Sequence, residues 1–370
     1  MRLAVDGREL RPGVRTGIGR YVLEVLRAAS RAGASCVVYG DAGARLDDAL
    51  PGVDFAMLRA PWTQWFDQVT LPRAIARDRP AVFLSPYYKM PLMAPCPVVV
   101  TIHDLYFIGY PGRHRPVYDA TVTRLARMYA RRSAAIVTDS EYSKRAIAAQ
   151  LGVSSSKVSV IPVALGPEFK PSPLTPTIAA RYGVAAPYVL YVGNFMPHKN
   201  LACLIRAFAL LAEAERRRHT LVLAGGYGES RPALARLAEE LGVAERVIFP
   251  GRIDDGDLPS LYSGAALYVS ASLEEGFGST VLEAMACGAP VAVSNRAALP
   301  EVVADAGLLF DPECEHEVAA ALARILTDAV LADDLRRRAL GRAGLFTSAR
   351  TSERVLDLLR GVAHGGGASA

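Results

Sequence analysis

Two α/β domains, each a parallel sheet covered by helices on both faces, are predicted by three features of this chain. Short runs rich in Val, Ile and Leu alternate with longer amphipathic runs, which is typical of parallel β-α-β units. Residues 166–176 hold four prolines and interrupt this alternation, so they indicate an interdomain linker. The length of 370 residues also exceeds what one hydrophobic core usually supports.

The first domain is expected to span residues 1–166, followed by a linker over 167–186. Its predicted strands are 2–6, 36–39, 82–85, 98–102, 135–138 and 158–162. Its predicted helices are 19–31, 117–131 and 143–150. Ligands of such sheets bind outside the carboxyl ends of the strands, so the residues just after each strand are the candidates for function.

The second domain is expected over residues 187–346. Its predicted strands are 188–192, 220–224, 247–249, 266–269 and 291–293, and its predicted helices are 200–213, 231–241 and 281–286. An amphipathic pattern at 351–362 predicts a C-terminal helix within 347–364, which we expect to cross back to the first domain. The glycine-rich tail 365–370 is expected to be flexible.

Composition excludes several classes of protein. With 51% hydrophobic and 21% charged residues the chain is globular, not disordered, collagen-like or coiled-coil. No apolar run approaches the roughly 18–20 residues of a membrane span, and Asp6 comes too early for a signal peptide. The five cysteines are odd in number and include no C-x-x-C pair, which favours a reducing compartment. We therefore expect a cytoplasmic protein, and we expect no nucleic-acid partner.

Charge is divided unevenly along the chain. Residues 1–166 carry 22 basic and 13 acidic side chains, a balance of +9, whereas residues 167–370 carry 20 and 24, a balance of −4. This asymmetry indicates two surfaces that meet different partners, although random variation of surface charge is the alternative.

The strongest local pattern follows the strand predicted to end near Ser270. Two glycines allow a tight turn, and a helix is expected to begin near Ser279. Because the first N–H groups of a helix have no partner within it, a diphosphate would rest on the amides of residues 279–281. Glu275 and Glu283 flank this turn, and ionised carboxylates accept hydrogen bonds from hydroxyls strongly. On spacing alone, an ordinary strand–loop–helix with a capping glutamate remains the alternative.

Residues 275–291, E-G-F-G-S-T-V-L-E-A-M-A-C-G-A-P-V, resemble the two-glutamate signature of glycosyltransferase family 4, retaining enzymes of the GT-B fold. Four further segments resemble family loops in the expected order: 16–21 (T-G-I-G-R-Y), 101–105 (T-I-H-D-L), 191–201 (Y-V-G-N-F-M-P-H-K-N-L) and 249–253 (F-P-G-R-I). The resemblance covers nearly the whole chain and implies two Rossmann-like domains facing across a cleft.

The resemblance implies a role for each matching residue. Glu275 should bind hydroxyls of the donor sugar, Glu283 the ribose diol, and Lys199 the charge that builds on the leaving diphosphate. Many relatives have an arginine at Asn194, so a second phosphate cation is in doubt here, and Arg252 is its candidate substitute. The other implied donor contacts are Gly17, Gly19, Gly193, Ile253, Gly276, Phe277, Gly278, Ser279, Thr280 and Val281.

The resemblance also places His103 beside the transferring sugar, so that His103, Lys199 and Glu275 form the implied catalytic set. A lone loop histidine is more often structural, and Asp104 next to it either orients it or competes with it. Trp62 and Trp65 lie three apart and suit a sugar or lipid acceptor, or a core. Residues 254–257 (D-D-G-D) are interpreted as a turn and helix cap, and neither a metal ion nor a cofactor is expected.

The predicted function is retaining transfer of a hexose from a nucleoside diphosphate sugar to a saccharide or lipid-linked hydroxyl. Similarity to bacterial mannosyltransferases of polysaccharide assembly favours GDP-mannose over UDP-sugars. The alternatives are a nucleotide-sugar epimerase of similar fold, a transferase using a UDP-sugar and a small-molecule acceptor, and a non-catalytic module that binds the donor. A dinucleotide oxidoreductase is disfavoured because no G-x-G-x-x-G follows the first predicted strand.

A basic segment indicates where the acceptor comes from. Between residues 113 and 132 there are six arginines (Arg113, Arg115, Arg124, Arg127, Arg131 and Arg132) and one acid, Asp119. The helix predicted at 117–131 offers Val117, Ala120, Leu125 and Met128 as apolar positions. Such a helix suits the anionic inner face of the plasma membrane or a phosphate-bearing lipid carrier, and the alternative is a solvated helix whose arginines pair with carboxylates.

Overall fold

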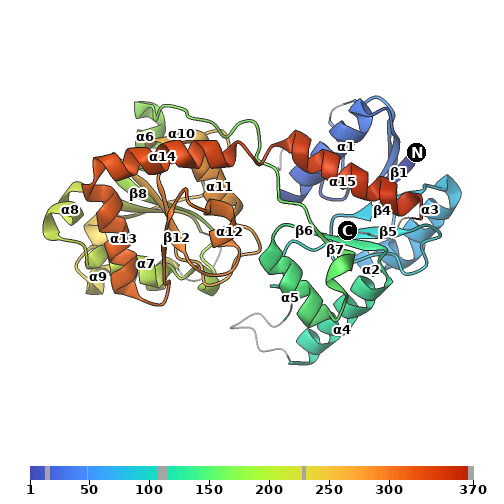
Figure 1. Ribbon diagram of the computed structural model, residues 1–370, viewed down its shortest axis with the longest axis horizontal. Helices are drawn as coiled ribbons and strands as arrows, with labels where there is room; N and C mark the ends of the chain where they lie inside the picture. The colour runs from blue at the N-terminus through green and yellow to red at the C-terminus, as the bar shows by residue number, and fades with distance from the viewer. Residues whose placement is uncertain (13–16, 48, 107, 109–115, 227–230, 366–370) are drawn as a thin grey trace. The chain divides into compact units, whose positions relative to one another are not determined.

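The computed structural model describes residues 1–365 apart from 13–16, 48, 107, 109–115 and 227–230. The described chain forms two compact units: Met1–Ala164 together with the C-terminal segment from Thr347, and Leu165–Phe346. Each unit is built on one parallel sheet with helices packed against it (Figure 1). The predicted fold class, two doubly wound α/β domains, is therefore confirmed.

Unit 1 contains a seven-stranded sheet among its described residues. Across the sheet the strands are β3 (Val53–Met57), β2 (Ser35–Gly40), β1 (Arg2–Asp6), β4 (Val82–Ser85), β5 (Val98–Thr101), β6 (Ala135–Thr138) and β7 (Val158–Val160), all parallel. The helical elements are α1 (Gly17–Arg31), α2 (Thr63–Trp65), the π-helix η1 (Phe66–Thr70), α3 (Leu71–Asp78), α4 (Pro116–Arg132), α5 (Glu141–Leu151), the 3₁₀-helix η2 (Ser155–Lys157) and α15 (Ser348–Ala363).

The alternation of side chains along each strand divides the core of unit 1 into two layers. Leu3 and Val5 of β1 pack with α1 and α15, whereas Ala4 packs with the layer of α3, α4 and α5. All three side chains are buried, as expected for a parallel sheet covered on both faces.

Unit 2 contains a six-stranded sheet among its described residues. Across it the strands are β10 (Val247–Gly251), β9 (Thr220–Gly225), β8 (Tyr188–Gly193), β11 (Leu267–Ser270), β12 (Val291–Ser294) and β13 (Leu308–Phe310), again all parallel. The helical elements are α6 (Pro176–Tyr182), η3 (Pro197–Lys199), α7 (Leu201–Ala209), α8 (Glu213–Arg218), α9 (Arg231–Glu240), η4 (Ala244–Arg246), α10 (Leu258–Gly264), α11 (Ser279–Ala286), α12 (Leu299–Val303), α13 (Glu315–Thr327) and α14 (Ala329–Ala343).

The C-terminal helix returns to unit 1, as predicted. Val355 and Leu359 of α15 are buried in the same core layer as Val22 and Leu26 of α1. Figure 1 shows α15 running alongside α1. Thr351 Oγ1 also donates a hydrogen bond to the carbonyl of Pro162 just beyond β7 (2.9 Å). The last helix is therefore part of the first sheet's packing.

Three local predictions differ from the structure. The helix predicted at 200–213 ends at Ala209, because the chain turns there and buries Leu211 in the core of unit 2; the next helix, α8, begins at Glu213. The predicted linker contains α6, because Pro176 occupies the first turn of that helix, where proline fits, and Thr175 caps it (3.3 Å to the amide of Ile178). Strands β3 and β13 were not predicted; both lie at sheet edges, where partly exposed residues weaken the apolar pattern.

Strand order determines which loops meet in each unit. In unit 1 the order reverses beside β1, whose neighbours are β2 and β4, and in unit 2 beside β8, whose neighbours are β9 and β11. Loops leaving adjacent strands at such a reversal diverge and leave room for a ligand at the carboxyl ends. We therefore expect ligand-binding residues in the loops after β1 and β4 and in those after β8 and β11.

Candidate active site

The reversal point of unit 2 brings Lys199 and Glu275 into contact. Lys199 follows β8 through η3, and Glu275 follows β11. Lys199 Nζ donates to Glu275 Oε1 at 2.5 Å, and the two side chains are only 14% and 13% exposed. Ser272 Oγ donates to the same oxygen at 2.9 Å. Lys199 and Glu275, both predicted from the sequence to bind the nucleotide sugar, therefore form a partly buried ion pair.

Gly278 forms the turn that starts α11. Its φ is +102°, in the region that favours glycine, and a Cβ there would lie 2.6 Å from Cδ2 of Leu299. The amide of Val281 donates to the carbonyl of Gly278 at 3.0 Å. Within the described structure, the amides of Ser279 and Thr280 have no acceptor. The diphosphate site predicted over residues 279–281 thus offers two free N–H groups, those of Ser279 and Thr280, because the N–H of Val281 is already bound.

Tyrosines of unit 2 hold the residues around this turn. Tyr262 donates its hydroxyl hydrogen to Glu283 Oε2 at 3.0 Å, and Tyr268 donates to Thr280 Oγ1 at 2.9 Å. Burial, reinforced by the charges of Glu275 and Glu283, raises the pKa of Tyr268, so this phenol stays protonated and remains a donor. Both glutamates of the signature therefore act on the same tyrosine.

The loop before Lys199 carries one further titratable group, His198. Burial and the adjacent Lys199 charge lower the pKa of His198 to about 4, so its imidazole is neutral at neutral pH. The positive charge of this loop therefore resides on Lys199.

The other predicted donor-binding residues lie at the ends of β8, β9 and β10, which are consecutive in the sheet. Asn194 follows β8 directly and is exposed, with its side-chain oxygen 3.4 Å from the amide of Met196. Arg252 and Ile253 follow β10, two strands from β8; Arg252 is exposed and Ile253 buried. Gly193 pairs with Gly225, where a Cβ would lie 1.9 Å from the carbonyl oxygen of Gly193. That Arg252 substitutes for the missing arginine stays a prediction.

In unit 1, His103 follows β5 and contacts Asp139, which follows β6. The Nδ1 of His103 lies 2.7 Å from Asp139 Oδ2. Asp104, the neighbour considered from sequence, instead accepts the amide hydrogen of Tyr106 at 3.0 Å. Gly17 begins α1 and is exposed, Gly19 is buried, and Thr16 of the same motif lies outside the described residues.

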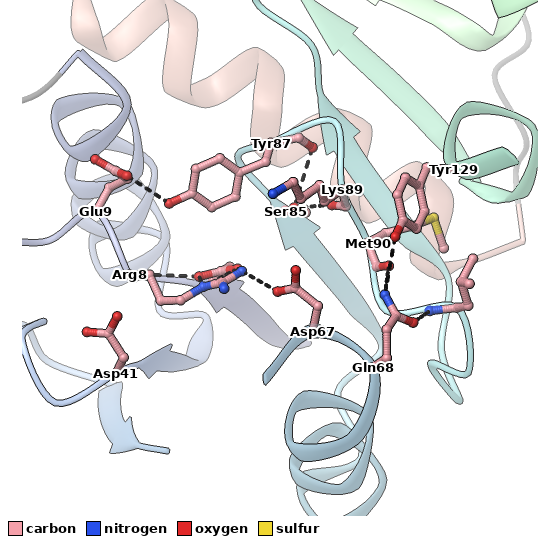
Figure 2. Close-up of polar contacts among 12 residues, drawn as sticks. Arg8, Glu9, Asp41, Asp67, Gln68, Ser85, Tyr87, Lys89, Met90 and Tyr129 are labelled. Carbon is pink, nitrogen blue, oxygen red and sulfur yellow. Dashed lines mark hydrogen bonds and ion pairs between the residues drawn. The ribbon is translucent and has the colours of Figure 1, made fainter. Parts of the chain in front are cut away.

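The reversal point of unit 1 holds a second polar cluster (Figure 2). Arg8, just after β1, is paired with Asp6 (2.6 Å) and with Asp67 of η1 (2.7 Å), and its guanidinium lies 4.3 Å from the ring centroid of Phe66. Burial raises the pKa of Asp67, and the Arg8 charge opposes this effect. With two carboxylates bound, Arg8 fixes η1 against the sheet and is not available to a ligand.

The loop after β4 supplies the other part of this cluster. Tyr87 donates its hydroxyl hydrogen to Glu9 Oε1 at 3.2 Å, and Ser85 Oγ donates to the carbonyl of Lys89 at 2.6 Å (Figure 2). Lys89 Nζ lies 5.7 Å from the ring centroid of Tyr88 and forms no ion pair with any described residue. Lys89 is thus a cation available at the carboxyl ends of β1 and β4.

Trp62 and Trp65 are on the surface just before η1. They are 58% and 42% exposed, and their rings meet edge to face with centroids 5.7 Å apart. The core alternative for these tryptophans is therefore wrong. At 254–257 the chain makes the predicted turn before α10, but the predicted cap is wrong: the side chain of Asp257 makes no cap hydrogen bond and instead binds Arg181 (2.7 Å) and Tyr182 (2.8 Å). No cluster of three or more His, Cys, Asp or Glu suited to a metal ion occurs in the described parts of the chain.

Sequence reasoning missed Asp139, Ser272 and Lys89 as members of these clusters. Each lies just after a strand, at the edge of the sheet that had already been singled out for ligands. Applying that rule to every predicted strand would have found them, whereas their partners depend on strand order, which the sequence pattern does not provide.

Comparison with known proteins identifies the class. Residues 183–342 match the family described as Glycosyl transferases group 1, and residues 15–169 match Glycosyltransferase Family 4. O-antigen chain mannosyltransferase B of Escherichia coli is 29% identical over 354 residues, covering 90% of this chain and 92% of that protein. The serotype-specific mannosyltransferase WbdA of Escherichia coli is 30% identical over 276 residues, 71% of this chain but only 33% of its own length.

Solved structures share the fold at low sequence identity. Sucrose-phosphate synthase of Thermosynechococcus elongatus superimposes with a TM-score of 0.78 at 22% identity, covering 98% of this chain and 99% of that one. WaaG, a glycosyltransferase of lipopolysaccharide biosynthesis, gives a TM-score of 0.73 at 17% identity, covering 98% and 100%. This is the GT-B fold of glycosyltransferases.

The chain belongs to glycosyltransferase family 4, as its five motifs predicted. It is a glycosyltransferase similar to bacterial mannosyltransferases. None of the helices in its described parts is long and apolar enough to cross a membrane.

The contact between Lys199 and Glu275 predicts that two substitutions will have different effects. Lys199→Ala should weaken binding of a nucleoside diphosphate about 10–100-fold, the cost of one charged hydrogen bond, without changing affinity for the nucleoside alone. Glu275→Gln should spare diphosphate affinity and lower kcat at least about 100-fold, because a sugar contact matters most in the transition state. Calorimetric titration and steady-state kinetics measure the two effects.

Lys170→Ala is the matched control, since Lys170 is an exposed lysine of the same unit. Equal losses for nucleoside and diphosphate in Lys199→Ala would indicate a purely structural lysine. If Glu275→Gln keeps wild-type turnover, Glu275 does not bind the donor sugar.

Proposed function

We propose that this glycosyltransferase transfers mannose, with retention of anomeric configuration, from GDP-mannose to a hydroxyl of a saccharide or lipid-linked acceptor. The observation that carries the proposal is the Lys199–Glu275 pair, with the free amides of Ser279 and Thr280 four and five residues after Glu275 in the chain. This group combines a cation and two N–H donors for a diphosphate with a carboxylate for sugar hydroxyls. The mannosyltransferase that matches over 90% of this chain supports the choice of sugar.

The residues divide the work of the reaction between the two ends of the donor. The amides of Ser279 and Thr280 and the Lys199 ammonium stabilise the negative charge that grows on the departing diphosphate. Glu275 holds the hexose, and Glu283, fixed by Tyr262, holds the ribose. The acceptor hydroxyl attacks on the face from which the diphosphate leaves, and its proton passes to the leaving phosphate. In this proposal no metal ion takes part.

The acceptor is assigned to the reversal point of unit 1. Lys89 supplies an available cation for a phosphate-bearing acceptor, and the exposed rings of Trp62 and Trp65, just before η1, supply apolar faces on which sugars stack. Asp104, the residue after His103, is the third residue that we assign to the acceptor. A lipid-linked saccharide offers both the phosphate and the sugar that these groups suit.

A transfer assay tests the proposal. With GDP-mannose and a mannose-containing or lipid-linked saccharide, the protein should release GDP and lengthen the acceptor with an α-linked mannose, seen by mass spectrometry and NMR. A thermal-shift series with GDP, UDP, ADP and TDP should favour GDP, because a ligand at 100-fold its Kd stabilises the folded state by about 2.7 kcal/mol.

Other outcomes of this assay would contradict the proposal in distinct ways. An epimerised sugar would indicate a nucleotide-sugar epimerase, and binding without turnover would indicate a donor-binding module. Preference for UDP with a small-molecule acceptor would replace the donor and acceptor assignments. HepE of Anabaena, which shares the fold with a TM-score of 0.72 at 20% identity, has been solved with UDP and glucose, so UDP-sugars belong in the series.

Of the basic segment between residues 113 and 132, the structure describes the part that forms α4, and the arginines of that helix are exposed. Ala126 and Tyr129 are buried in the core of unit 1, and Met128 packs against it; Val122 is also buried. Ala120 and Leu125 are exposed, so the packing face differs from the predicted set, and the side chain of Val117 lies outside the description. Tyr118 and Leu125 are 59% and 40% exposed beside four exposed arginines, Arg124, Arg127, Arg131 and Arg132. None of these four pairs with a carboxylate of a described residue, which argues against the solvated ion-paired alternative. Arg113 and Arg115 lie outside the described residues.

We therefore propose that α4 docks on an anionic membrane surface, where a lipid-linked acceptor is found. Each arginine near such a surface contributes about 1 kcal/mol, so the protein should sediment with anionic but not zwitterionic liposomes and dissociate as salt rises. Arg124→Glu with Arg132→Glu should abolish sedimentation. The charge-matched control, Arg217→Glu with Arg218→Glu on exposed positions of α8, should not. Equal sedimentation of both variants would rule out α4 as the docking surface.

A further inference from the structure

Loops leaving two adjacent strands bring His103 and Asp139 together. β5 and β6 are paired in the sheet, with Thr101 opposite Val137; His103 lies two positions after the end of β5, and Asp139 lies one position after the end of β6. The Nδ1 of His103 and Oδ2 of Asp139 are 2.7 Å apart, within the range of a charge-assisted hydrogen bond. Strand pairing therefore builds this contact from residues 36 apart in the sequence.

The backbone around the pair is held on both sides. Thr138 Oγ1 donates to the carbonyl of Ile102 at 2.7 Å, and the amide of Ile102 donates to the carbonyl of Val137 at 2.8 Å. Ser140 Oγ accepts from the amide of Ser143 at 3.0 Å and caps the start of α5 directly after Asp139. These hydrogen bonds hold the backbone next to both partners at the end of the sheet.

The second nitrogen of the imidazole has no partner. His103 is 24% exposed as a side chain, yet its Nε2 is buried and makes no hydrogen bond to any described residue. Leaving a buried polar atom unsatisfied is unfavourable, so such an atom calls for an explanation. A ligand that contacts Nε2 during the reaction provides one.

We propose that Asp139 is the positioning residue for His103: its carboxylate accepts the Nδ1 proton, fixes the ring, and so directs Nε2–H of the imidazolium to an oxygen of a bound sugar. The inference rests on the proposed glycosyl transfer and on the place beside the sugar that the family resemblance implies for His103. It assigns the orienting carboxylate, which the sequence did not identify. Asp104 is not that group, since it caps its own turn through the amide of Tyr106.

Charged and titratable groups around His103 favour the imidazolium. Asp139 lies against Nδ1, Asp104 is the next residue, and the Tyr21 ring of α1 meets the imidazole edge to face at 5.8 Å. Burial by itself lowers the pKa of His103, but the Asp139 carboxylate, with a smaller effect of Asp104, outweighs burial and the pKa is raised. Burial also raises the pKa of Tyr21, which donates to or accepts from Thr101 Oγ1 (3.2 Å), so Tyr21 stays neutral.

The raised pKa of His103 determines in which direction pH changes the activity. Because the pKa of His103 is raised in the folded protein, the imidazolium is present at low pH and is lost as pH rises through that pKa. Activity that needs Nε2–H falls over the same range. Replacing Asp139 by a neutral residue leaves the effect of burial largely unopposed, so the loss begins at lower pH.

Asp139→Asn tests the inference because asparagine keeps the shape and a hydrogen-bond acceptor but removes the charge. We expect kcat at pH 8 to fall about tenfold or more, the donor KM to change less, and the alkaline limb of the kcat profile to move to lower pH. NMR titration of protein with isotope-labelled histidine, with the His103 signal assigned by its loss in His103→Gln, should show the same downward shift of the His103 pKa. The matched control is Glu215→Gln, which neutralises the carboxylate 3.4 Å from His219 in unit 2 and should change neither profile nor kcat.

Several results would overturn the inference. A uniform loss of kcat at every pH with an unmoved alkaline limb would mean that Asp139 only supports the fold. An unchanged His103 pKa in Asp139→Asn would also reject the pairing. Wild-type kcat in His103→Gln would remove the histidine from the reaction while leaving the donor assignment of unit 2 intact. The titration requires no substrate, so it decides the pairing separately from the transfer assay.

Discussion

The reversal of strand order in a parallel sheet is the constraint on which this structure depends. Placing β8 between β9 and β11 leaves a crevice at the carboxyl ends of β8 and β11, where the loops after these strands diverge. Lys199 and Glu275, 76 residues apart, meet there. In unit 1, β1 stands in the same relation to β2 and β4, and that edge holds Arg8 and Lys89. One topological rule thus positions both polar clusters.

Steric limits at single glycines refine what topology provides. Gly278 adopts φ +102° and lets α11 begin directly after the loop that carries Glu275, so the first amides of the helix lie next to the ion pair in the chain. Gly225 allows β9 to pair with β8 as far as Gly193, where any side chain would strike the carbonyl oxygen. Glycine is therefore required at the end of β9 and at the start of α11.

The sequence predicted the two-domain fold, the family and the return of the C-terminal helix, because buried strands and ordered motifs leave clear apolar and glycine patterns. It did not predict the edge strands β3 and β13, which are short and partly exposed. It also named His103 without finding Asp139, since their contact depends on β5 and β6 being neighbours rather than on spacing. Pro176 misled the linker prediction because proline breaks a helix interior but suits a helix start.

The central claim is that the turn at Gly278, with Lys199 and Glu275, holds the diphosphate and sugar of the donor. The most direct measurement is a crystal structure of the protein with GDP-mannose or a non-transferable analogue. The account predicts phosphate oxygens within hydrogen-bond distance of the Ser279 and Thr280 amides and of Lys199 Nζ, with sugar hydroxyls on Glu275 and ribose hydroxyls on Glu283. Electron density for the diphosphate away from the start of α11 would contradict it.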